Sequence, residues 1–258
     1  MSSEYIQFLD WQVGRFGEGR KQRLYAAMHV QGGDRVLDAG CGPGTDTLAL
    51  AQIVGPTGRV VGLDIREEMV VTANQRAREA GVAGWVEHKV CDVSSMPFED
   101  GYFDACHAER LFMHLHQPGQ AFFEMARVTR PGGWIATVSF DWATLSIDTP
   151  EAEIERKISA YIGALHNNPY AGRQLYRFYK QQGFSDILVD TQLDPITDLA
   201  TADALLFLKK RAEQACSIGV VTRNELERFR ASLEEADRIG AFFCQFSRVT
   251  IVGCKPDM

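Results

Sequence analysis

Three glycines at every second position follow a short apolar run that ends in a carboxylate. Residues 35–46 read RVLDAGCGPGTD. The apolar run predicts the end of a buried strand, and the glycines predict a turn with an open backbone that leads into a helix. Such a turn can bind a nucleoside-bearing ligand at the edge of a parallel sheet. The expected chemistry is recognition of a nucleoside cofactor, and the competing interpretation is a tight turn that binds nothing.

The spacing of the glycines separates two classes of cofactor. A dinucleotide fingerprint requires Gly-x-Gly-x-x-Gly, but threonines occupy positions 45 and 47, where the third glycine would fall. The pattern Asp38-x-Gly40-x-Gly42-x-Gly44 instead resembles the first motif of class I S-adenosylmethionine-dependent methyltransferases. A dinucleotide cofactor is kept as the lesser alternative.

The next apolar runs also end in acidic residues. Residues 59–63 precede Asp64, about twenty residues after the glycines, where a carboxylate can accept both hydroxyls of a ribose. Residues 85–90 precede Asp92, to which the resemblance assigns the adenine amino group. Glu109 ends a fourth run and resembles the position that meets the methionine part of the cofactor. The cofactor-binding residues implied by the resemblance are Asp38, Gly40, Gly42, Gly44, Asp64, Ile65, Met69, Cys91, Asp92, Val93 and Glu109.

The resemblance covers residues 35–140 and is closest to the small-molecule branch of the family, which includes quinone-biosynthesis and natural-product enzymes. Residues 127–134, RVTRPGGW, are similar to the family's turn into its fifth strand. The resemblance implies an α/β fold with a doubly wound, mostly parallel, seven-stranded Rossmann-like sheet. Its last strand is expected to run antiparallel and to insert between two others.

Composition limits the class of protein. With 258 residues and 45% hydrophobic content, the chain can form one elaborated domain with a sizeable core. The net charge of -7 and the lack of a basic run argue against nucleic acid as a partner. Six cysteines without a Cys-x-x-Cys pair argue against a metal site. Because the sequence shows neither a leader pattern nor a membrane-spanning stretch, we expect a cytoplasmic protein.

Helix and strand signals alternate along the chain. Expected helices cover residues 45–54, 66–80, 149–167 and 172–182, with a further helix opened by a capping box at Thr222 and Glu225 and ending near Arg238. Expected late strands cover residues 184–190 and roughly 243–254. The fifth strand is expected to end before Asp141.

Three regions add to this frame, and the first two are expected to determine the choice of substrate. The first is an N-terminal helical cap, residues 1–30, with aromatic residues Tyr5, Phe8, Trp11 and Phe16. The second is a substrate-side insert, residues 141–183, whose aromatic and polar residues suit a planar or apolar small molecule unless they are ordinary packing: Asp141, Trp142, Tyr161, His166, Tyr170, Tyr176, Phe178 and Tyr179. The third is an insertion at residues 201–238, interpreted as a helix pair that forms a lid or a homodimer contact.

The expected reaction is transfer of a methyl group from S-adenosylmethionine to an O, N or C atom of a small, aromatic or apolar metabolite. A general base is needed only where the acceptor must lose a proton. Candidates near strand ends or in the insert are His107, His114, Asp141 and His166, and no single one is assigned. The alternative function is binding of S-adenosylmethionine without transfer, as in a cyclase-like protein or a regulatory subunit.

Overall fold

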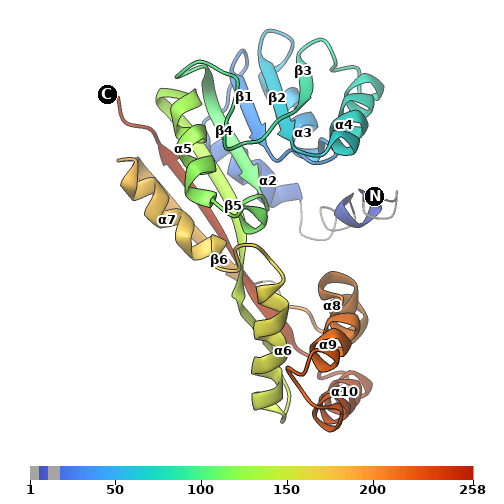
Figure 1. Ribbon diagram of the computed structural model, residues 1–258. Coiled ribbons are helices and arrows are strands. Elements are labelled where there is room, and N and C mark those ends of the chain that lie inside the picture. Colours follow the sequence, from blue (N-terminus) through green and yellow to red (C-terminus); the bar gives the residue numbers. More distant parts are fainter. Residues whose placement is uncertain (1–5, 11–17, 194, 258) are drawn as a thin grey trace.

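The computed structural model describes residues 6–10, 18–193 and 195–257 (Figure 1). A seven-stranded sheet has the order β3-β2-β1-β4-β5-β7-β6. Its strands are β1 (Arg35–Ala39), β2 (Arg59–Asp64), β3 (Val86–Val90), β4 (Phe103–Glu109), β5 (Thr129–Ile147), β6 (Ser185–Leu193) and β7 (Cys244–Cys254). The pairs among β1 to β5 are parallel, whereas β7 runs antiparallel to both β5 and β6. The expected doubly wound sheet, with its last strand inserted between two others, is confirmed.

Alternation along the strands divides the core into two layers. Val36 of β1 and Val60 of β2 belong to a cluster with α2 (Glu18–Ala27), α3 (Thr45–Val54) and α4 (Glu67–Glu79). Their neighbours Leu37 and Val61 point to the opposite face and pack with α5 (Pro118–Val128) and α7 (Ala171–Gln181). Successive side chains of a strand face opposite sides, so apolar residues at consecutive positions require helices on both faces. All six cysteines lie in the described part of the chain and are free thiols.

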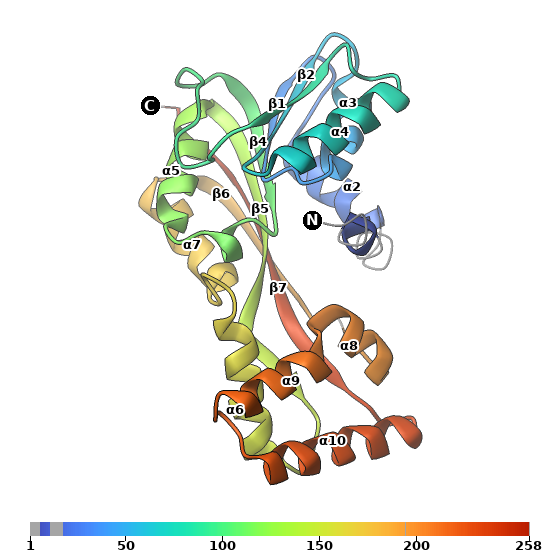
Figure 2. The same cartoon turned by 45° about the vertical axis from the view of Figure 1, so that its right-hand side comes forward.

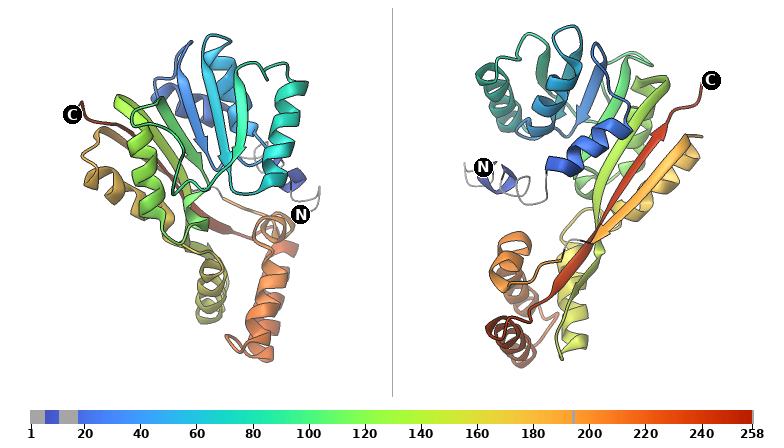
Figure 3. Two further views of the ribbon diagram at one scale, coloured as in Figure 1. Left: turned by 45° about the horizontal axis from the view of Figure 1, so that its top comes forward. Right: turned by 180° about the vertical axis from the view of Figure 1, so that it is seen from behind.

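Two strands continue beyond the rest of the sheet and form the base of a second lobe. Figures 2 and 3 show β5 and β7 running on toward α6 (Ala152–Ala164), α8 (Leu199–Leu206), α9 (Leu208–Ser217) and α10 (Arg223–Arg238). We use the name second lobe for these four helices and the extended ends of the two strands. Trp142 of β5 stacks on Phe246 of β7 at 5.0 Å, and this contact is part of the same hydrophobic cluster as the core beneath α5 and α7. The second lobe is therefore continuous with the main core.

The structure corrects two expectations in this region. Asp141 does not follow the fifth strand, because β5 continues through it to Ile147. Residues 201–238 are not part of a helix pair but belong to three helices. Phe207, with a φ of +49°, separates α8 from α9. None of the helices among the described residues is long and apolar enough to cross a bilayer.

Candidate functional site

The turn between β1 and α3, residues 40–44, is called the glycine turn below. Its three glycines differ in what surrounds them. Their φ values are +75°, +53° and +86°, in the left-handed region that favours glycine. A Cβ on Gly40 would lie 2.9 Å from Leu111 Cδ1, and one on Gly44 would lie 2.9 Å from Ala73 Cβ. A Cβ on Gly42 would meet no atom within 4 Å. Gly40 and Gly44 are thus required for packing, while Gly42 borders open space.

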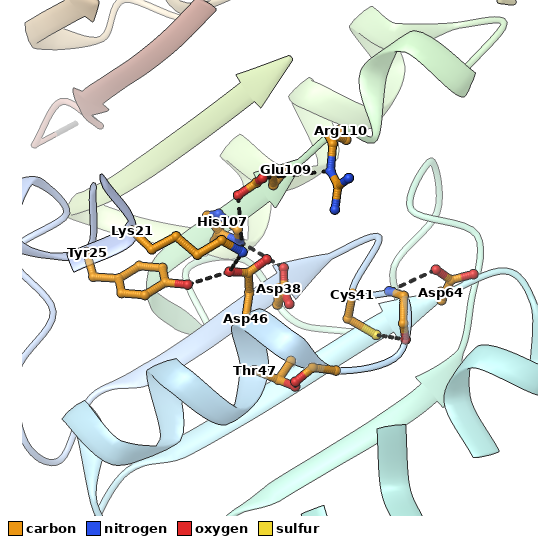
Figure 4. A network of polar contacts seen from close by, with 12 residues as sticks. Lys21, Tyr25, Asp38, Cys41, Asp46, Thr47, Asp64, His107, Glu109 and Arg110 are labelled. Carbon is orange, nitrogen blue, oxygen red and sulfur yellow. Dashed lines mark hydrogen bonds and ion pairs between the residues drawn. The ribbon is translucent and has the colours of Figure 1, made fainter. Parts of the chain in front are cut away.

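Asp64 ends β2 beside this turn and is 6% exposed. One carboxylate oxygen accepts a hydrogen bond from the Gly42 amide at 3.0 Å (Figure 4). The other accepts one from the Arg66 amide at 2.9 Å. The predicted ribose acceptor and the predicted turn are therefore in direct contact. Of the neighbouring predicted residues, Ile65 is 68% exposed, whereas Met69 lies fully buried in α4.

The loop after β3 carries the predicted adenine subsite. The Cys91 amide donates to the Asp64 carbonyl at 3.1 Å, which joins this loop to the end of β2. Asp92 is exposed and accepts a hydrogen bond from the Ser94 amide at 2.8 Å, while Val93 is buried. Further along the loop, Arg127 of α5 donates to the carbonyls of residues 96 and 98 at 3.0 and 2.7 Å. The same guanidinium pairs with the carboxylate of Glu124 at 2.8 Å, so α5 holds the loop in place.

Asp38 and His107 form a buried pair across two adjacent strands. They occupy opposite positions in the β1–β4 register, and His107 Nδ1 lies 2.9 Å from Asp38 Oδ1. Their outer atoms, Asp38 Oδ2 and His107 Nε2, are buried with no hydrogen-bond partner in the part of the chain that the structure describes. Burial raises the pKa of Asp38, and the hydrogen bond and charge of Asp38 raise the pKa of His107 against its own burial. His107 lies within β4 and is fully enclosed, so its ring is closed to a substrate.

A second polar network, which the sequence analysis did not identify, covers this pair. Lys21 of α2 places its ammonium 2.5 Å from Asp46 and 3.5 Å from Glu109 (Figure 4). Tyr25, one turn further along α2, donates its hydroxyl proton to Asp46. Burial alone would raise the pKa of Asp46, but the charge of Lys21 and the hydrogen bonds lower it to about 2. The only signal for this network in the sequence is Asp46, an acidic residue in the first turn of the helix that follows the glycines.

The acidic groups of this network also resemble a metal site in their spacing. Ligand atoms of Asp46, His107 and Glu109 lie within 4.8 Å of one another. The Lys21 ammonium already supplies positive charge to both carboxylates. The network therefore contains its own cation, which pairs with both carboxylates.

The remaining candidates for a base separate into two groups. Asp141 is 2% exposed and bound by Arg173, whose Nη2 lies 2.9 Å from its carboxylate, so it is held in a structural ion pair. His114, in a short 3₁₀ helix (Phe112–His114), and His166, after α6, have ring centroids 6.3 Å apart. Desolvation and nearby positive charges lower the pKa of His114, and burial and the charge of Arg211 lower that of His166 to about 4. Both imidazoles are therefore neutral at pH 7.

The aromatic residues expected to form the substrate side differ in their exposure to solvent. Phe178 and Tyr179 are 8% and 0% exposed in the core beneath the sheet, where ordinary packing explains them. Tyr161 is half-buried, and Tyr170 and Tyr176 are exposed. In the N-terminal segment, Phe8 lies 5.8 Å from the ring of Phe207 in the second lobe. Tyr5, Trp11 and Phe16 lie outside the described residues.

A cavity of about 440 Å³ adjoins the site at Lys21 and Glu109. It lies between α2 and one face of β5, β6 and β7, and the glycine turn and Asp64 are not part of its wall. Its wall combines apolar side chains with more basic than acidic groups. The lining residues are Arg20, Lys21, Arg23, Leu24, Ala27, Glu109, Arg110, Val138, Phe140, Leu188, Val189, Asp190, Gln192, Arg248, Thr250 and Val252.

Comparison with known proteins gives consistent matches. A family model described as a methyltransferase domain matches residues 31–183. An uncharacterised 37.1 kDa protein of a transposon in Streptomyces fradiae is 34% identical over 233 residues, which cover 90% of this chain and 66% of that protein. The ubiquinone/menaquinone biosynthesis C-methyltransferase UbiE of Pseudomonas fluorescens is 29% identical over 180 residues, covering 65% of this chain and 68% of that enzyme.

Among solved structures, the geranyl diphosphate C-methyltransferase of Streptomyces coelicolor, crystallised with S-adenosylhomocysteine, matches with a TM-score of 0.60. The two are 23% identical, and the match covers 93% of this chain and 77% of the other. At that identity the likeness concerns the fold.

Proposed function

The chain belongs to the family of methyltransferase domains, and from this premise we propose that it transfers a methyl group from S-adenosylmethionine to an O, N or C atom of a small, aromatic or apolar metabolite. The observation that carries the proposal is the open space at Gly42 beside the buried carboxylate of Asp64. A backbone without a side chain, next to an acceptor for ribose hydroxyls, is what a nucleoside cofactor requires.

The residues present fit the cofactor. Asp64 would accept the ribose hydroxyls, because one of its oxygens faces the glycine turn. Asp92 is exposed at the neighbouring strand end and would accept the adenine amino group. Glu109, the last residue of β4, would meet the methionine part. The other residues proposed to line the cofactor site are Gly40, Gly42, Gly44, Ile65, Met69, Cys91 and Val93.

The protein contributes mainly position and exclusion of water. When bound, the cofactor supplies a methyl group on a positively charged sulfur, which is already activated for transfer. The second lobe and the loop after β4 would hold the acceptor in line at a near-attack distance and keep water away. His114 and His166, both neutral at pH 7, are the imidazoles available to take a proton from a hydroxyl acceptor.

Substrate choice is proposed to lie in the regions outside the common sheet. These are the N-terminal cap at residues 1–30, the insert at 141–183 and the insertion at 201–238. We further propose a cytoplasmic enzyme of secondary metabolism that does not bind nucleic acid and forms a homodimer. The net charge of -7 supports the exclusion of nucleic acid.

Calorimetry and a transfer assay test this function together. Wild-type protein is expected to bind S-adenosylmethionine, and Asp64→Ala to weaken that binding by tenfold or more, because a charged hydrogen-bond acceptor is lost (about 1.5–3 kcal/mol). Arg35, whose side chain pairs with Asp104 at 3.9 Å away from the site, offers a control variant, Arg35→Ala, that should bind the cofactor normally. Cofactor labelled at the methyl carbon would then be offered with a panel of aromatic and isoprenoid metabolites. Tight binding of NADH in place of S-adenosylmethionine would exclude the proposal, and cofactor binding without any labelled product would favour a protein that binds but does not transfer.

A further inference from the structure

Arg211, in the first turn of α9, carries a charge that the described part of the chain does not neutralise. Its Nη1 is buried with no hydrogen-bond partner there, and no ion pair joins it to a described carboxylate. Its guanidinium lies over the ring of Phe207, 5.7 Å from Cζ to the ring centroid. Neighbouring arginines of the second lobe behave differently, since Arg223 and Arg230 both pair with Glu213, at 2.7 and 2.6 Å.

A buried guanidinium nitrogen without an acceptor is costly. Arginine keeps its proton in proteins, so the group cannot avoid the cost by becoming neutral. Burial lowers the pKa of Arg211, which reflects the same penalty. A ligand that supplied the missing acceptor would remove this cost, and functional sites are places where stability is given up in this way.

The position of Arg211 connects it with the cofactor end of the molecule. Its helix α9 packs against α6, and His166 follows the end of α6, with its ring 6.3 Å from that of His114 between centroids. The loop that carries His166 is fixed to the segment after β4, because Asn167 donates to the His114 carbonyl at 2.7 Å and the Asn168 amide donates to the Met113 carbonyl at 3.0 Å.

The segment that carries His114 also meets the glycine turn, because the side chain of Leu111 lies against Gly40 and the Leu111 carbonyl accepts a hydrogen bond from the His114 amide at 2.9 Å. Arg211 therefore belongs to the part of the second lobe that meets the proposed site of methyl transfer.

We propose that the methyl acceptor carries an acidic group, a carboxylate or a phosphate, and that Arg211 binds this group. The inference rests on the proposed function and specifies the substrate class. A guanidinium offers two parallel N–H donors that match the oxygens of either anion. Since no described carboxylate pairs with Arg211, the anionic group of the substrate would be the acceptor that its Nη1 lacks. Arg211 would then select acidic acceptors over neutral molecules of the same shape.

Benzoate, inorganic phosphate and neutral benzamide are suitable probes, used on the full chain in the presence of S-adenosylmethionine. Benzoate or phosphate should shift the imidazole NMR signals of His166 and raise its pKa, because an anion offsets the charge of Arg211. Benzamide should not. Arg211→Gln should weaken anion binding by about tenfold or more, the loss expected for a hydrogen-bonded charge. Arg223→Gln, which removes a paired arginine from the same lobe, should leave it unchanged.

Thermal unfolding without probe separates a binding role from a structural one. Relief of an unpaired buried charge should leave the Tm of Arg211→Gln equal to that of the wild type or raise it by about 2–4 °C. A structural arginine would lower it. The proposal is overturned if Tm falls by that amount, if wild-type protein responds to neither anion, or if Arg248→Gln in the basic cavity abolishes the response while Arg211→Gln does not.

The failure of this inference is distinguishable from failure of the proposed function. Calorimetry on the same samples reports cofactor binding independently of the anion. Protein that binds S-adenosylmethionine but shows no role for Arg211 contradicts the acidic substrate alone. Protein that does not bind S-adenosylmethionine contradicts the function itself.

Discussion

Gly42→Ala should weaken binding of S-adenosylmethionine without unfolding the protein. The new methyl group would meet no protein atom within 4 Å, so the fold accepts it sterically. The cost to stability comes from the φ of +53°, about 1–2 kcal/mol for a residue with a Cβ. For a chain of this size, that cost corresponds to a fall in Tm of roughly 2–8 °C. The same methyl group would overpack the cofactor by about 1–3 kcal/mol, which weakens binding by a factor of about 5 to 150.

Gly81→Ala is the matched control. Gly81 has a φ of +71° and equally open surroundings, but it follows α4 rather than β1. Both variants should lose similar stability in thermal unfolding, and calorimetry should find weakened binding in Gly42→Ala alone. Equal affinity in the two variants would refute the assignment of the open space to the cofactor.

Three further predictions concern the surroundings of the site. Burial lowers the pKa of His88 to about 4, from 6.5 in the unfolded chain. Its contribution to stability is therefore complete above pH 6.5 and declines by on the order of 3 kcal/mol as pH falls toward 4. In urea unfolding at several pH values, the free energy of unfolding of His88→Gln should depend less steeply on pH than that of the wild type, and parallel profiles would contradict this. Arg127→Lys should loosen residues 92–100, because an ammonium cannot reproduce the forked contacts of the guanidinium. We expect faster hydrogen exchange in these residues and severalfold weaker cofactor binding. Unchanged exchange would count against the role of Arg127 in holding this loop. Bound cofactor should slow the alkylation of the half-buried Cys91 by iodoacetamide, measured by mass spectrometry. Cys41 is 7% exposed and burial raises its pKa, so it should react slowly with or without cofactor. Equal alkylation rates of Cys91 with and without cofactor would place the cofactor elsewhere.

Local signals in the sequence predicted the elements that depend on local chemistry. The helix after the glycine turn has the predicted bounds, Thr45–Val54, because Gly44 and Gly55 flank it. The capping box at Thr222 and Glu225 forms as predicted, with both reciprocal hydrogen bonds present. In each case the residues that start or end the helix lie within a few positions of it.

Elements that depend on distant contacts were missed. The length of β5 was underestimated because Asp141 was interpreted as the end of the strand. Its charge is neutralised by Arg173, which lies 32 positions further along the chain. The break between α8 and α9 depends on the left-handed conformation of Phe207, a residue type that gives no local signal for it.

The candidate site shows the same division. The proximity of Asp64 to the glycine turn followed from the ends of two parallel strands. The pairing of Asp38 with His107 required knowledge that β1 and β4 are neighbours in a particular register. Lys21 was missed because α2 lies outside the family pattern, and its partner Asp46 lies 25 positions away. Arg211 has no motif at all, and only its burial without an acceptor drew attention to it.

Because β5 and β7 both continue into the second lobe, their length sets the distance between the lobe and the nucleoside end, although their pairing shifts register between Asp141 and Ser146. A strand advances by about 3.3 Å per residue, so two residues added to each strand would lift the lobe by roughly 6.6 Å and keep every side chain on its own face. One added residue would turn all the following side chains over. Outside that register shift, such an architecture is adjusted to longer or shorter molecules in steps of two residues, with no change at the nucleoside end.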